Sequence, residues 1–146
     1  MNTGHPVVRV TRRFDAAPGR VFDAWLDAEM IGRWMFGPSL RDEEVVRIAL
    51  DARVGGSFSF VVRRQGQEID HIGEYREIIR PRRLVFTWGI AQDKPDMSRV
   101  IVDIVALASG CELTLTHELH PDWADYASRT EAGWTKMLAA LAATLG

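Results

Sequence analysis

The spacing of apolar residues changes along the chain and divides it into four segments. Residues 7–14, VVRVTRRF, have the composition of a strand. In residues 15–36 apolar side chains recur at three- and four-residue steps, which predicts a pair of amphipathic helices with Pro18 near the start. From about 43 to 120 the period becomes two, which indicates an antiparallel meander of about six strands. Residues 122–145 carry one apolar helical stripe, so the pattern predicts an α+β fold in which a long C-terminal helix packs on the sheet.

Turn residues between the strands predict which side chains share a face of that sheet. A two-residue loop at Gln65-Gly66 sets Phe60 opposite His71. A four-residue connection in the following hairpin sets Glu77 opposite Leu84. Both registers keep one parity on one face, so we expect all these side chains to point to the inside of the sheet.

The last hairpin decides whether the stretch TLTHELHPDW, residues 114–123, forms a cluster of chemical groups. A turn at Ser109-Gly110 sets Val102 opposite His117, which then lies on an apolar inner face, whereas His120 points outward. Two ligands on opposite faces cannot share a tetrahedral metal ion unless the strand ends between them, and the strand is expected to end near His120. We therefore predict no metal site.

The predicted inner face combines aromatic rings with a few polar tips. Such an interior is typical of a small-molecule cavity, although the rings would equally fill a core in which the polar tips bond one another or the backbone. The candidate cavity residues are Trp34, Met35, Phe58, Phe60, His71, Tyr75, Glu77, Phe86, Trp88, His117, Trp134 and Met137.

Composition and charge exclude several classes of partner. The chain has 146 residues, a formal net charge of −2 and a single cysteine, Cys111. A near-neutral chain gives no strong field to attract nucleic acid, and no window approaches the roughly 20 apolar residues of a membrane helix. The N-terminal residues lack the apolar run of a signal peptide, so a cytoplasmic location is expected. No phosphate loop, nucleophile elbow or metal motif occurs in the sequence, and no cofactor is expected.

Five segments in order resemble a known family over nearly the whole chain. They are VTRRFDAAPGRVFDAWLDAEMIGRWMFGP at 10–38, DARVGGSFSF at 51–60, GEYREIIRPRRLVFTW at 73–88, LTLTHEL at 113–119 and EAGWTKMLAALAATL at 131–145. The chain is similar to the START-like, or SRPBCC, superfamily, and within it to the activator of heat-shock protein 90 ATPase homologue group. The resemblance implies a single domain, 1–146, with a helix-grip fold: a curved antiparallel sheet of about six to seven strands around a long C-terminal helix, with two short helices after the first strand.

The resemblance also implies a cavity between the sheet and the last helix. In various members of the superfamily it holds hydrophobic ligands, and a few members are enzymes. The residues expected to line or cap it are Trp34, Phe60, Tyr75, Trp88, His117, Trp134 and Met137.

Three functions compete at this point. The leading one is an intracellular protein that binds a small hydrophobic molecule. The second is an enzyme in which His117 acts as general acid or base, helped by Glu77, His71 or Tyr75. The third is a chaperone-associated interaction module that would use apolar residues of the outer sheet face, although a homodimer contact would explain those residues as well. No catalytic residue is assigned.

Overall fold

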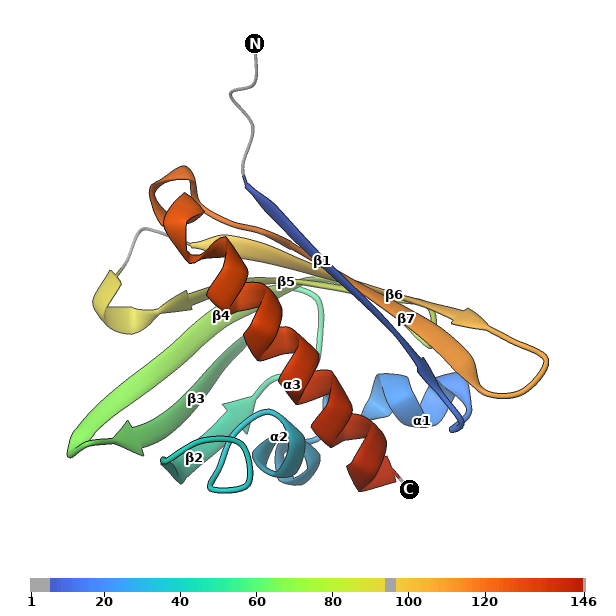
Figure 1. Cartoon of the computed structure of the whole chain (residues 1–146), viewed down its shortest axis with the longest axis horizontal. Coiled ribbons are helices and arrows are strands. Elements are labelled where there is room, and N and C mark those ends of the chain that lie inside the picture. Colours follow the sequence, from blue (N-terminus) through green and yellow to red (C-terminus); the bar gives the residue numbers. More distant parts are fainter. Residues whose placement is uncertain (1–5, 94–96, 146) are drawn as a thin grey trace, which may run out of the picture.

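The computed structural model describes residues 6–93 and 97–145, and these form seven strands, two short helices after the first strand and one long C-terminal helix (Figure 1). Two 3-10 segments, the three-residue η1 and the six-residue η2, complete the described elements. In chain order the elements are β1 (Val7–Phe14), α1 (Pro18–Asp23), α2 (Ala28–Trp34), β2 (Glu44–Leu50), β3 (Ser57–Arg64), β4 (Gln67–Ile79), β5 (Arg83–Ile90), η1 (Ala91–Asp93), β6 (Ser98–Ala106), β7 (Cys111–Glu118), η2 (Pro121–Tyr126) and α3 (Ala127–Leu145).

The seven strands form one curved antiparallel sheet in the order β1-β7-β6-β5-β4-β3-β2. Strands β2 to β7 form a simple meander, and β1 adds to its β7 edge in antiparallel orientation. The helix α3 crosses the sheet diagonally, and α1 and α2 lie near its C-terminal end (Figure 1). The predicted α+β helix-grip architecture is confirmed.

Local sequence explains where the two short helices begin and end. Pro18 stands at the first turn of α1, where its missing N–H is not needed. Asp27 caps α2, because its carboxylate accepts hydrogen bonds from the backbone N–H groups of Glu29 and Met30. Gly37 then adopts a φ of 112°, which favours glycine and turns the chain away from α2.

The first predicted hairpin register is confirmed. Gln65 and Gly66 both have positive φ, 50° and 78°, as a two-residue hairpin turn of the primed type requires. Phe60 pairs with His71 as predicted, and in the same register Phe58 pairs with Gly73. The long strand β4 therefore presents His71 to the same face as the phenylalanine rings of β3.

The register predicted for the next hairpin is wrong beyond Tyr75. Tyr75 pairs with Phe86, but the register then shifts, and Glu77 pairs with Val85 instead of Leu84. A β-bulge adds one residue to β4, which reverses the parity of the side chains that follow. Glu77 consequently points to the outer face, where its carboxylate accepts a hydrogen bond from Arg83 at 3.2 Å, and it is not a cavity residue.

The last hairpin is offset by two residues from the predicted register. His117 pairs with Val100, because the loop spans four residues, 107–110, and is closed by a hydrogen bond from Leu107 N to Gly110 O at 3.1 Å. A shift of two residues preserves parity, so His117 still faces inward and is buried with 3% exposure.

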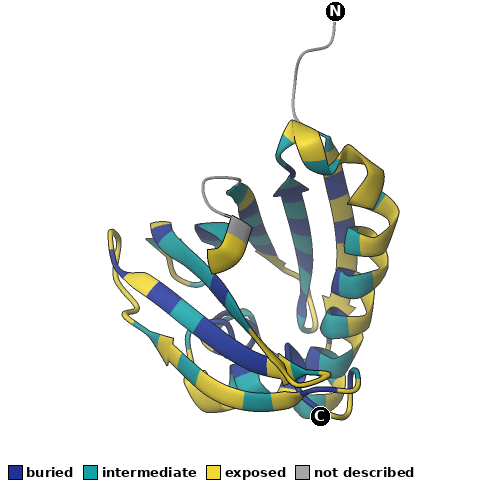
Figure 2. Cartoon of the chain, turned by 90° about the vertical axis from the view of Figure 1, so that its left-hand side faces the viewer, coloured by how far each residue is buried: buried dark blue, intermediate teal, exposed yellow. Residues whose placement is uncertain are grey.

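The core lies between the sheet and α3. Trp134, Leu138 and Leu141 are the buried residues of α3, and they follow the predicted helical stripe. Figure 2 shows exposed residues on the outer side of this helix and buried strand residues behind it. No helix within the described ranges is long and apolar enough to cross a membrane.

Candidate functional site

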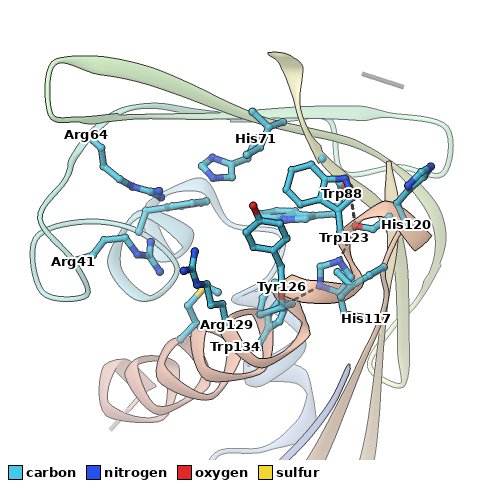
Figure 3. A pocket seen from close by; sticks show the side chains of 18 residues that line it. Arg41, Arg64, His71, Trp88, His117, His120, Trp123, Tyr126, Arg129 and Trp134 are labelled. Atoms are coloured by element: carbon cyan, nitrogen blue, oxygen red, sulfur yellow. Dashed lines mark hydrogen bonds between the residues drawn. The ribbon is translucent and has the colours of Figure 1, made fainter. Parts of the chain in front are cut away.

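A pocket of about 340 Å³ lies where the β3–β4 hairpin, the ends of β5 and β7, the segment η2 and the first turns of α3 meet (Figure 3). Its wall is part aromatic and part cationic. The lining residues are Phe36, Arg41, Arg64, His71, Trp88, Gly89, Ile90, Ser98, His117, Leu119, His120, Trp123, Tyr126, Arg129, Thr130, Gly133, Trp134 and Met137.

The structure places most of the candidate residues in one of two groups, at the pocket or deeper in the core. Those at the pocket are His71, Trp88, His117, Trp134 and Met137. Those deeper in the molecule surround only a void of about 10 Å³, which is room for about one water molecule, so their rings fill the core: Met35, Phe58, Phe60, Tyr75 and Phe86. Trp34 lies outside both spaces, fully buried, with its Nε1–H donated to Ala24 O at 3.0 Å.

The hydrogen bonds of His117 fix the form of its ring. Trp134 Nε1–H can only donate, and it lies 3.0 Å from His117 Nδ1, so Nδ1 is the acceptor. The proton of the neutral ring is then on Nε2, which donates to Ser98 Oγ at 2.7 Å. Ser98 in turn donates to the carbonyl of Trp88 at 2.8 Å. Burial lowers the pKa of His117 to about 4, which keeps this neutral form.

His71 has the opposite tautomer. Its Nδ1 lies 3.0 Å from the carbonyl oxygen of Phe60, which can only accept, so Nδ1 carries the proton and Nε2 is left as an acceptor. Burial, with help from the charges of Arg64 and Arg41, lowers the pKa of His71 to about 4. The ring packs between Phe36 and Trp88, with centroid distances of 4.8 and 5.4 Å.

A buried carboxylate organises the cationic end of the pocket. The side chain of Glu43 has no exposed surface, and it accepts hydrogen bonds from Gly37 N at 2.8 Å, Arg41 Nη1 at 3.0 Å and Arg64 Nε at 2.7 Å. Burial acts to raise the pKa of Glu43, but these hydrogen bonds and charges outweigh it and leave the pKa below its ordinary value. Glu43 is therefore a carboxylate that holds two guanidinium groups in place.

A third arginine reaches the pocket from α3. The guanidinium of Arg129 lies over the ring of Tyr126 at 5.7 Å, within cation–π distance, and Tyr126 contacts Trp123 at 5.2 Å. Within 6–93 and 97–145, no carboxylate forms an ion pair with Arg129. Face parity could not predict these three residues, because Trp123 and Tyr126 lie in η2 rather than in a strand, and Arg129 lies in the first turns of α3.

His120 also lies at the pocket and not on the outer face of a strand. The strand β7 ends at Glu118, so its parity does not extend to His120. His120 Nδ1 accepts from the backbone N–H of Asp122 at 3.1 Å and thereby caps η2. Among the residues that the structure describes, no group of three or more His, Cys, Asp or Glu side chains is placed to hold a metal ion.

One family model matches most of the chain. A family model described as Activator of Hsp90 ATPase homolog 1-like protein matches residues 15–146. A search of curated proteins found no match.

Several solved structures share the fold over nearly their whole length. Protein CV1439 from Chromobacterium violaceum is 27% identical with a TM-score of 0.82, and the match covers 95% of this chain and 96% of that one. Mll3558 from Rhizobium loti is 26% identical with a TM-score of 0.80 and the same coverage. PFC0360w, an HSP90 activator from Plasmodium falciparum, is 26% identical with a TM-score of 0.74, and 96% of each chain is covered.

Proposed function

The chain belongs to the family of Activator of Hsp90 ATPase homolog 1-like proteins, and we propose that within this family it binds a small molecule with a large apolar part in the pocket between the sheet and α3. The observation that carries the proposal is the pocket itself. Its volume of about 340 Å³ falls in the range of roughly 300–1,000 Å³ that is typical of small-molecule sites.

The aromatic wall supports an apolar ligand. The ring centroids of Trp88 and Trp134 lie 5.8 Å apart, and Met137 lines the same wall. Indole rings and a flexible thioether offer a large contact area at little cost in side-chain ordering. An apolar body placed here would remove that surface from water, at roughly 25 cal/mol for each Å² buried.

Catalysis by His117 is less well supported than binding. Both ring nitrogens are engaged, because Nδ1 accepts from Trp134 and Nε2 donates to Ser98. The Ser98 hydroxyl donates to a backbone carbonyl, so His117 does not accept its proton as a general base would. The histidine instead fixes Trp134 in the pocket wall.

A chaperone contact is the second candidate, because one related structure is an HSP90 activator at 26% identity. The apolar residues expected to form a contact on the outer sheet face are Val85, Ile101 and Val105. Val85 is fully buried, Ile101 is half-buried and only Val105 is well exposed, at 61%, so this face offers little apolar surface. Stimulation of an Hsp90 ATPase by the purified protein, with no effect of pocket variants, would favour this candidate over ligand binding. A cytoplasmic location and a homodimer remain predictions.

Gly133 offers a direct test of the ligand pocket. It lines the pocket, and a Cβ added there would meet only Met137 Cε, at 3.9 Å. Gly133→Leu places a side chain in the pocket while replacing a poor helix former by a good one, so the folded protein is expected to be at least as stable. Gly73 is unsuitable for such a test, because a Cβ there would lie 1.9 Å from Thr87 O.

The measurement is the melting temperature of the wild type and Gly133→Leu with a panel of small amphipathic and apolar compounds. Compounds that stabilise the wild type are expected to lose their effect on Gly133→Leu and to keep it on the matched variant Ala139→Leu, which alters an exposed position of the same helix. A panel without effect on the wild type, or an equal effect on both variants, contradicts the proposal.

A further inference from the structure

The charged side chains that line the pocket surface are all arginines. The described residues that line it include three arginines but no aspartate or glutamate, and the two buried histidines of the lining, His71 and His117, are neutral. The whole chain, by contrast, has slightly more acidic than basic residues, 20 against 18. The positive lining is therefore a property of this site and does not follow from the composition of the protein.

Three guanidinium groups from three different elements converge on one end of the pocket (Figure 3). Arg41 comes from the connection between α2 and β2, Arg64 from the end of β3 and Arg129 from α3. Like charges brought together repel one another unless an anion lies between them. The arrangement thus favours occupation by a negative group.

Glu43 supplies only part of the compensating charge. Its one negative charge against three arginines leaves a local net charge of +2. Glu43 also engages only one nitrogen of each arginine that it binds, Nη1 of Arg41 and Nε of Arg64. Apart from a bond from Arg41 Nη1 to Met35 O, no other nitrogen of these two side chains has a hydrogen-bond partner among the described residues. The remaining N–H groups of Arg41 and Arg64 lie at the pocket and are able to donate hydrogen bonds to a ligand.

The opposite part of the pocket has a different character. Trp88, Trp134 and Met137 form an apolar wall, and the ring nitrogens of His117 are already bonded. A molecule that satisfies both parts has an apolar body and an oxyanion at one end. Guanidinium forks bind carboxylate, sulfonate and phosphate oxygens through paired hydrogen bonds.

We propose that the pocket binds an amphipathic organic anion, with its oxyanion held by Arg41, Arg64 and Arg129 and its apolar body against Trp88 and Trp134. The inference rests on the proposed function, since it names the class of ligand for the same site. It goes beyond that function in requiring a negative charge on the ligand.

Two fluorescent probes with the same ring system separate charge from apolar contact. 1-Anilinonaphthalene-8-sulfonate carries a sulfonate, and N-phenyl-1-naphthylamine is the same molecule without it. The wild type is expected to bind the sulfonate probe at least tenfold more tightly than the neutral probe. Added salt should weaken binding of the sulfonate and leave the neutral probe unchanged, because the arginines lie near solvent.

Substitutions then assign the charge effect to the three arginines. Arg129→Gln removes a charge that has no carboxylate partner among the described residues, so folding should be unaffected. The affinity for the sulfonate probe is expected to fall roughly tenfold, and the affinity for the neutral probe should stay within twofold. Arg64→Gln should act in the same direction. The control is Arg76→Gln, an equal change of charge at an exposed residue of β4 outside the pocket lining, which should affect neither probe.

The outcomes distinguish the two levels of the proposal. The requirement for an anion is overturned if the wild type binds both probes with equal affinity, or if Arg129→Gln and Arg64→Gln have no effect. Apolar binding in the pocket still stands in that case if Gly133→Leu weakens the binding of both probes. If neither probe binds, or if Gly133→Leu weakens neither, the small-molecule site itself is contradicted.

Competition with decanoate, decyl phosphate and decanol then identifies the head group. Either anion should displace the sulfonate probe at least tenfold better than the alcohol, and their order tells carboxylate from phosphate. Equal displacement by decanol overturns the requirement for an anion.

Discussion

His71 and His117 are the two buried histidines whose charge the fold suppresses. Each has its folded-state pKa lowered from 6.5 to about 4, chiefly because burial disfavours the imidazolium. Between about pH 4 and pH 6.5 the unfolded chain therefore binds more protons than the folded protein. Stability is complete above the unfolded pKa and is lost as the pH falls from about 6.5 toward 4.

This gives a pH prediction for single residues. Between pH 7.5 and pH 5.0 each of these histidines should remove about 2 kcal/mol from the free energy of unfolding. In His117→Gln the loss measured by urea unfolding at the two pH values should be smaller by about that amount. An equal loss in the wild type and the variant would show that His117 is not held neutral by the fold.

At the residue scale, sequence reasoning identified the inward direction of His117 but not its partners. Parity alone places a side chain on one face, and the two-residue error in the last hairpin left parity unchanged. The bond from Trp134 depends on how α3 is positioned over the sheet, and no local pattern specifies that. Glu77 was misplaced because a single bulge residue is invisible in an alternating pattern.

At the element scale, the connection between α2 and β2 is held by one buried carboxylate. Glu43 bonds the backbone at Gly37 and the side chains of Arg41 and Arg64, so it joins this connection to the end of β3. The α3 helix fastens the same connection, because Lys136 Nζ donates to Leu40 O. Glu43 therefore fixes the connection relative to β3, while Lys136 fixes it relative to α3.

Removing this charge should loosen the connection. Glu43→Gln leaves two arginines without their anion, and we expect it to lower the free energy of unfolding by about 2 kcal/mol or more, measured in urea at pH 7.5. The control is Glu29→Gln, which breaks an exposed pair with Arg33 within α2 and should cost less than about 0.5 kcal/mol. Equal costs for the two variants would mean that Glu43 does not organise this region.

Periodicity was sufficient for the order and type of the elements, and insufficient for the pocket. The strands and helices follow from spacing that repeats over many residues. Arg41 lies in a connection, and Trp123 and Tyr126 lie in the short kinked segment η2. No period applies to either segment, so periodicity does not predict this part of the pocket. A sequence signal did exist in Glu43, because an acidic residue next to a predicted strand start can pair with nearby arginines, but its burial depends on tertiary packing.

At the scale of the whole molecule, the sheet and α3 enclose two different interiors. Behind Trp134 the space is filled by rings such as Trp25 and Trp34, whose centroids lie 4.6 Å apart in an edge-to-face arrangement. Near the N-terminal end of α3 the pocket remains open, with Trp88, Trp123 and Trp134 in its wall. The five tryptophans of the chain are thus divided between a filled core and a candidate binding site.

This division provides the most direct test of ligand binding in the pocket. The indole N–H signals of the 15N-labelled protein, assigned with single Trp→Phe variants, are followed by NMR during titration with 1-anilinonaphthalene-8-sulfonate. The account predicts large saturable shifts of the Trp88, Trp123 and Trp134 signals, a smaller shift of Trp25, whose ring centroid lies 6.0 Å from that of Trp134, and a nearly unchanged signal of Trp34. Shifts of equal size at all five indoles, or no shift at the three pocket tryptophans, would contradict a ligand site at this end of the molecule.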